Sequence, residues 1–160
     1  MRVHRIVLVL LAVLVLVVSA GCGGGGQPSA EDYADSVVLN RNRADFVLTR
    51  ITKAQSPEEL LNRMDEAALV ISKAADELDE KGAPDEFQPE ADNLVKSLHQ
   101  LSVDLQATAD QAREPGFGGL ITDPSLQGLS FDSWDDVNEA LAGLAGKGIQ
   151  VTIIQPKAAS

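Results

Sequence analysis

The chain has 160 residues, and its 24 acidic side chains against 13 basic ones give a formal net charge of −11 at neutral pH. This acidity argues against nucleic-acid binding, which needs a basic surface to neutralise phosphates. Aromatic residues are few, with four phenylalanines, one tryptophan and one tyrosine, and there is a single cysteine. The core must therefore consist of aliphatic side chains, no intramolecular disulfide can form, and the length suits one small domain.

The first 21 residues have the pattern of an export signal. Arg2 and Arg5 precede an unbroken apolar run over residues 6–18, and small residues follow it. A membrane-spanning helix needs about 20 apolar residues, and this run is shorter, so a cleaved signal peptide over residues 1–21 is favoured over a transmembrane helix. Removing Arg2 and Arg5 with the signal leaves 11 basic against 24 acidic residues, a net charge of −13.

The only cysteine directly follows this run, in the sequence Ser19-Ala20-Gly21-Cys22. A lone cysteine in an exported protein is either a free thiol or a modified one. Here the chain resembles bacterial lipoproteins, in which the lipobox cysteine receives diacylglycerol on its sulfur and becomes the mature N-terminus. Ser19 stands where that motif usually has an aliphatic residue. The resemblance implies that Cys22 is lipidated and holds the protein on the outer face of the cell membrane.

Residues 22–29 form a glycine-rich tether between this anchor and the body of the protein. We expect Gly23 to Gly26 and the polar residues after them to behave as a random coil, with a reach of about 15 Å. No strand precedes these glycines and no lysine follows at the spacing of a phosphate-binding loop. Because the mature chain is acidic, the acyl chains and not charge must supply the attachment to lipid.

Three stretches of the body place an apolar residue at alternating steps of four and three, which predicts one buried stripe on each of three helices. The connections between them are short, so consecutive helices should run antiparallel. The first stripe is Tyr33, Val37, Asn40, Ala44, Val47, Ile51 and Ala54; the second is Leu60, Met64, Ala67, Ile71, Ala74 and Leu78; the third is Phe87, Ala91, Leu94, Leu98, Leu101, Leu105, Thr108 and Ala112.

Helix-start and helix-stop signals agree with these stripes. Ser56-Pro57 followed by Glu59 predicts a capped helix start, and Lys81-Gly82 with Pro84 predicts a stop. A short fourth helix is expected from Ser133 to Gly146, followed by an extended apolar tail that lies across the bundle, because a lone strand has no sheet to join. The expected fold is all-α: an antiparallel three-helix bundle with a fourth short C-terminal helix and an extended tail, over residues 30–155, with 156–160 as a C-terminal tail.

Few residues of the body are candidates for chemistry. His99 lies beside the third stripe without a carboxylate partner at helical spacing, and no histidine–cysteine set for zinc exists. The acidic cluster at Asp76, Glu77, Asp79 and Glu80 lies on a helix, which cannot wrap around calcium as a loop can. No nucleophile-elbow pattern is present. We therefore expect no catalytic residue, no metal and no cofactor.

Asn40 is the one strongly polar residue on a predicted stripe, and two interpretations of it remain open. A buried amide must be hydrogen-bonded or it costs about 1–3 kcal/mol. It can set the register of the helices, as polar residues do in coiled coils. It can instead contact a ligand in a pocket between the helices.

The long connection over residues 114–132 is more apolar than a solvated linker requires. Phe117, Leu120 and Ile121 either pack onto the bundle as a strap or form a partner surface, since exposed apolar patches usually mark binding sites. Trp134 belongs to the same candidate surface, although it can also close the end of the core beside Phe131.

The body resembles small helical lipoproteins of unknown function from high-GC Gram-positive bacteria. The resemblance lies in Ala20-Gly21-Cys22-Gly23, in Pro84-Asp85-Glu86-Phe87 before a leucine-rich helix, and in the segment WDDVNEALAGLAGKGIQV. This resemblance implies a cellular location and a fold, and it assigns no functional residue except Cys22. The expected function is that of a membrane-anchored, extracytoplasmic, non-enzymatic bundle that binds a cell-envelope protein or acts as a surface scaffold. The alternative is a carrier or receptor for a small apolar ligand between the helices.

Overall fold

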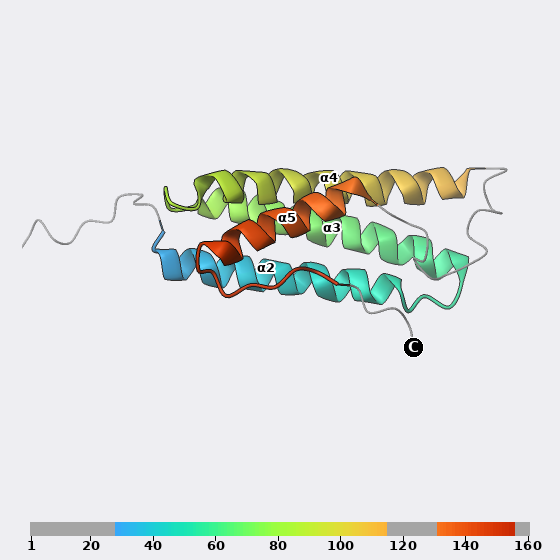
Figure 1. Cartoon of the computed structure of the whole chain (residues 1–160). Coiled ribbons are helices and arrows are strands. Elements are labelled where there is room, and N and C mark those ends of the chain that lie inside the picture. The colour runs from blue at the N-terminus through green and yellow to red at the C-terminus, as the bar shows by residue number, and fades with distance from the viewer. Residues whose placement is uncertain (1–27, 115–130, 156–160) are drawn as a thin grey trace, which may run out of the picture.

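The computed structural model describes residues 28–114 and 131–155, and within these ranges the protein is all-helical (Figure 1). Consecutive helices run in opposite directions, and an extended segment after the last one runs back along the first (Figure 1). The predicted fold class is confirmed: three long antiparallel helices, a shorter fourth helix and an extended tail. The helices are α2 (Ala30–Ile51), α3 (Pro57–Lys81), α4 (Gln88–Arg113) and α5 (Asp132–Gly146).

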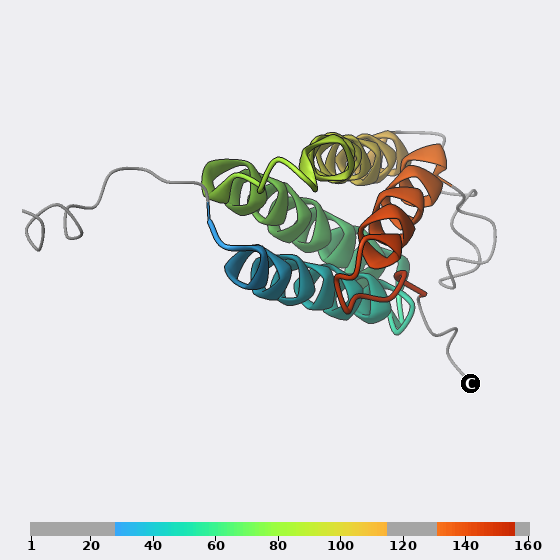
Figure 2. The same cartoon turned by 60° about the vertical axis from the view of Figure 1, so that its left-hand side comes forward.

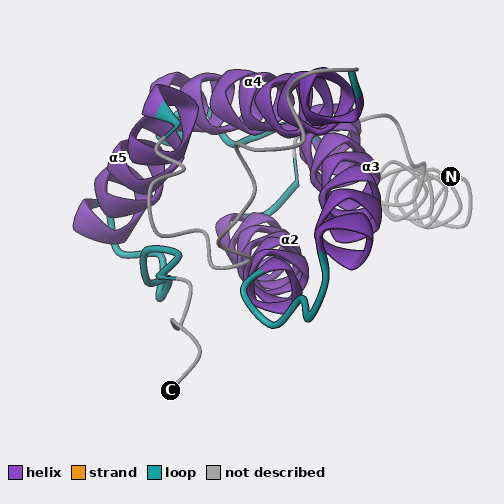
Figure 3. Ribbon diagram, turned by 90° about the vertical axis from the view of Figure 1, so that its right-hand side faces the viewer, coloured by secondary structure: helices purple, strands orange, loops and turns teal. Residues whose placement is uncertain are grey.

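The helices are arranged in chain order around a common interior. α3 lies between α2 and α4 and packs against both, and α5 packs against α4, whereas α2 and α5 do not pack directly on each other. Residues 149–155, which we call the strap, lie between α2 and α5 (Figures 2 and 3). The strap therefore forms the remaining side of the bundle, as the tail was expected to do.

The buried residues follow the predicted stripes closely. Every residue of the first two stripes is buried, although α2 ends at Ile51 and Ala54 is buried in the turn after it. In α4 the stripe departs from prediction near its end, where Thr108 and Ala112 are only half-buried and Ala109 is fully buried. The reason is geometric: a helix has 3.6 residues per turn, so a strict seven-residue pattern drifts around it.

The capping signals form the contacts that their sequence implies. Ser56 is the N-cap of α3, with its Oγ accepting from the Glu59 backbone N–H at 3.1 Å. The Glu59 carboxylate accepts from the backbone N–H of Gln55 at 2.7 Å, so two free donors at this helix start are satisfied. Gly82 ends α3 with a φ of +70°, a conformation that favours glycine.

Polar contacts at both ends of α5 fix its position against α4. Ser133 Oγ donates to the Asp104 carboxylate, and Lys147 Nζ donates to the Glu86 carbonyl at 2.7 Å and to the Glu90 carboxylate at 2.5 Å. The two helices approach closely at Gly143, where an added Cβ would lie 2.9 Å from Glu90 Cγ. Of the helices in the described ranges, none has the length and hydrophobicity to cross a membrane.

Candidate functional site

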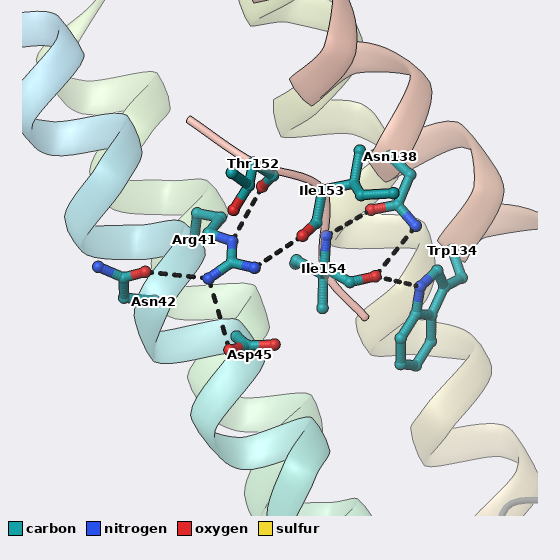
Figure 4. A network of polar contacts seen from close by, with 8 residues as sticks. All are labelled: Arg41, Asn42, Asp45, Trp134, Asn138, Thr152, Ile153 and Ile154. Atoms are coloured by element: carbon teal, nitrogen blue, oxygen red, sulfur yellow. Dashed lines mark hydrogen bonds and ion pairs between the residues drawn. The ribbon is translucent and has the colours of Figure 1, made fainter. Parts of the chain in front are cut away.

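The strap is held between α2 and α5 by two buried side chains and by contacts to its backbone. Ile149 and Ile154 are 3% and 2% exposed. Asn138 of α5 donates to the Ile154 carbonyl at 3.2 Å and accepts from the Ile154 N–H at 2.8 Å, and Trp134 Nε1 donates to the same carbonyl at 3.3 Å (Figure 4). Asn138 thus pairs with the strap backbone much as a neighbouring strand would.

Arg41 makes the corresponding contacts from α2. Its Nε donates to the Thr152 carbonyl at 2.9 Å, and its Nη2 donates to the Ile153 carbonyl at 2.7 Å (Figure 4). Its Nη1 lies 3.4 Å from the Asp45 carboxylate, which holds the guanidinium over the strap. These contacts reach the backbone, whereas the side chains of Thr152 and Ile153 are exposed.

A second feature is an exposed apolar surface between α3 and α4. Leu69 is 71% exposed and Val103 is 58% exposed, and both line a surface groove of about 380 Å³. Ser102 Oγ donates to the Ala68 carbonyl at 2.8 Å beneath this groove and joins the two helices. We call this the α3/α4 surface; its residues are Ala68, Leu69, Ser72, Ser102, Val103, Gln106, Ala107 and Asp110.

A larger groove of about 510 Å³ lies between α4 and α5, and its lining is mainly polar. Lys96 is the basic residue of this lining, and Glu90, Asp136 and Glu139 are its acidic ones. The hydrogen bond from Lys147 lowers the pKa of the Glu90 carboxyl below its ordinary value. Its polar and mostly acidic lining makes this groove a poorer fit to an apolar side chain than the α3/α4 surface.

Asn40 and Tyr33 are the polar side chains of the first stripe, and the structure buries both. The Asn40 Oδ1 accepts from Arg43 Nη1 at 3.2 Å, so the amide has a partner on its own helix. The Tyr33 hydroxyl is buried and has no hydrogen-bond partner in the part of the chain that the structure describes, while its ring stacks on Phe87 with centroids 6.0 Å apart. Burial and the nearby Asp92 carboxylate raise the pKa of Tyr33 to about 12.

The acidic cluster of α3 takes part in ion pairs with neighbouring helices. His99 Nε2 of α4 lies 3.5 Å from the Asp76 carboxylate, and Arg43 of α2 pairs with Glu77. Both sites are partly exposed, so each pair contributes little to stability. Within the described residues no group of three or more metal-ligating side chains comes together.

The structure places only part of the candidate set. Cys22, Phe117, Leu120 and Ile121 lie outside the described residues, and their roles stay predictions. Trp134 is half-buried against the core and donates to the strap backbone, and its place in a partner surface stays a prediction.

The residues that sequence reasoning missed are Arg41 and Asn138 in the strap contacts and Leu69 and Val103 on the α3/α4 surface. Arg41 and Asn138 are single polar residues on amphipathic helices, with nothing in their spacing to show that they meet the same segment. The signal for Leu69 and Val103 was available, since each is a large apolar residue placed on the polar side of its helix.

No family model matches the chain, and comparisons with curated proteins and with solved structures find no similar protein.

Proposed function

We propose that the protein is a lipid-anchored, extracytoplasmic helical bundle that binds another protein of the cell envelope and has no enzymatic role. The motif before Cys22 supports the anchor, and the structure of the body is compatible with a rigid module at the end of a short tether. The bundle is built of closely packed helices, and of its large exposed apolar residues Leu39, Phe46, Leu69 and Val103 belong to those helices, whereas Ile153 lies in the strap.

The observation that carries the proposal is the α3/α4 surface. Leu69 and Val103 are large apolar side chains left in water on two neighbouring helices, at the rim of one groove. Their exposure costs free energy that contact with a partner would recover, at about 25 cal/mol for each Å² buried. An open surface of this kind supports a protein partner more directly than the alternative of a carrier, which needs an enclosed apolar site.

The charge of the protein indicates the chemistry of the partner. The mature chain carries an excess of 13 acidic residues, 24 against 11, so a partner with a basic rim around an apolar centre would be favoured over an acidic one. Asp110 and Gln106 lie at the rim of the α3/α4 surface and can accept hydrogen bonds from such groups.

Two measurements in the producing cell test the proposal separately. Cys22→Ala should move the protein from the membrane to the soluble fraction or stall its processing, and an intact mass that shows an unmodified thiol would rule out the anchor. A photo-crosslinking residue at position 69 or 103 should give the same single adduct. The matched control is position 39, since Leu39 is 50% exposed on α2, away from this surface. Equal adducts at all three positions, or none, would contradict partner binding here.

A further inference from the structure

The site between α2 and α5 has the properties of a peptide-binding groove that the chain fills with its own strap. α2 and α5 do not pack on each other, so the strap is what joins them. Arg41, Trp134 and Asn138 all contact its backbone carbonyl or N–H groups, over the three consecutive residues 152–154. The close-up shows these side chains converging on the strap from both helices (Figure 4).

Such contacts recognise the extended backbone of a bound segment, and they do not depend on the identity of most of its side chains. The groove reads the strap sequence mainly at Ile149 and Ile154, the two buried positions, whereas Thr152 and Ile153 are exposed. A suitable occupant is therefore an extended segment with apolar side chains five residues apart. The strap of a second copy meets these requirements, because its sequence is the same as that of the strap already bound in the groove.

The connection between α5 and the strap provides a hinge. Gly148 has a φ of +102°, and its turn reverses the chain so that the strap returns along α2 (Figure 1). Within the described residues no helix follows the strap, so its release would unfold none of them. A change of backbone conformation at this turn is enough to carry the strap away from its own groove.

We propose that the strap groove also receives the strap of a second copy of this chain. Two copies exchange residues 149–155 reciprocally and form a symmetric, closed dimer in which each groove keeps the contacts described above. This inference goes beyond the proposed function and does not depend on lipidation or on the α3/α4 surface. In the monomer the strap is attached to its groove, at an effective concentration in the mM range, so the dimer is a minor species in dilute solution.

The turn at Gly148 allows a direct test with the purified full chain in detergent. An alanine at this φ is strained, although a Cβ there meets no atom within 4 Å. Exchange opens the turn in both copies and releases this strain. Each opened turn should favour the dimer over the monomer by about tenfold. Gly148→Ala should therefore lower the dimer dissociation constant by about a hundredfold, which brings the dimer into the range of about 10 µM in light scattering or analytical ultracentrifugation.

Two glycines provide matched controls. Gly146→Ala adds a Cβ into open space two residues away, at a position without a positive φ, and should stay monomeric. Gly82→Ala is also strained, with a φ of +70°, but lies in the turn after α3, so it should lose stability without dimerising. A Gly148→Ala chain that is destabilised and monomeric, as Gly82→Ala should be, would overturn the proposal.

Mixing two complementary variants gives a second readout. One variant carries Arg41→Ala and Asn138→Ala and has a defective groove with an intact strap. The other carries Ile154→Asp and has a defective strap with an intact groove. Both are made in the Gly148→Ala background, and circular dichroism verifies that each is helical. In the mixture the intact strap of the first variant can enter the intact groove of the second, so this single exchange should give a one-to-one heterodimer at concentrations where each variant alone is monomeric. A mixture that remains monomeric, with both variants folded, would contradict strap exchange.

Discussion

Tyr33 and Asn40 lie seven residues apart on the same buried stripe of α2, and they differ in whether their polar groups are hydrogen-bonded. The Asn40 amide has a partner in Arg43, whereas the Tyr33 hydroxyl has none among the described residues. A buried polar group without a partner costs about 1–3 kcal/mol, so Tyr33 is retained at some loss of stability. The stacking of its ring on Phe87, which joins the starts of α2 and α4, is the compensating interaction that the structure shows.

Tyr33→Phe should keep the ring stacking and remove the unpaired hydroxyl, so we expect the free energy of unfolding at pH 7 to stay the same or to rise. The wild-type chain should also lose stability above pH 10. Burial raises the pKa of Tyr33 in the folded protein to about 12 from an ordinary value of 10.0. Between these pH values the unfolded chain has lost the phenolic proton and the folded chain still holds it, so stability falls as pH rises.

The measurement is urea unfolding at several pH values, with the Tyr33→Phe chain beside the wild type. Tyr33 is the only tyrosine in the sequence, so the absorbance of the phenolate reports its titration directly. A phenolate that forms near pH 10 in the folded protein would contradict the burial argument. So would an equal loss of stability between pH 10 and 12 in the two chains.

Asn40→Leu should leave stability unchanged or raise it, because an apolar side chain removes the need to desolvate an amide. Arg43 loses an acceptor but keeps its ion pair with Glu77 at the surface. Chemical denaturation would measure the effect, with Asn62→Leu at an exposed position of α3 as the control. A loss of more than about 2 kcal/mol would mean that the amide makes a buried contact that leucine cannot replace.

At the scale of the elements, local sequence patterns predicted the helices, their caps and nearly all of the buried stripes. Apolar spacing and capping residues act within a few turns of one helix, so the sequence displays them directly. The neighbour relations among helices depend on side chains that are distant in the chain. The meeting of Arg41 with residues 152 and 153 spans more than a hundred residues and has no local signal.

The departure near the end of α4 has a different and local origin, the period of the helix itself. The heptad pattern selected Thr108 and Ala112, because the preceding leucines followed it, while the true helical period brought Ala109 into the core. The candidate site was the least predictable part: the sequence shows Leu69 and Val103 singly on the polar sides of their helices, but only the packing of α3 on α4 shows that they line the same groove.

Leu98 and Leu101 of α4 provide the test of core packing. They are 4% and 1% exposed, and truncation of either to alanine should lower the free energy of unfolding by about 2–5 kcal/mol. Val103→Ala, on the exposed side of the same helix, should change it by less than about 0.5 kcal/mol. Thermal or urea unfolding measures all three variants. An unchanged midpoint for either leucine variant would contradict the burial of that residue in the core.

At the scale of the whole molecule, the position of the tether determines how the bundle would stand on a membrane. α2 begins at the same end of the bundle as the turn between α3 and α4, whereas the turn between α2 and α3 lies at the opposite end (Figure 1). α4 has 26 residues and is therefore about 39 Å long. With Cys22 lipidated as proposed, a tether with a reach of about 15 Å would hold the first end near the lipid, and the acidic surface would give the sides of the bundle no attraction to anionic headgroups.

In the lipidated chain, the end of the bundle that carries the tether should consequently lie near the membrane, and the opposite end should lie away from it. Glu86→Cys and Glu58→Cys place a fluorescent label in exposed positions near the two ends, with the same loss of charge in each variant. With Cys22 acylated, the label reacts at the new cysteine alone. A quencher attached to lipid headgroups should quench the label at position 86 more strongly than the label at position 58, and added anionic lipid should weaken both signals. Equal quenching at the two positions would mean that the bundle lies flat on the membrane.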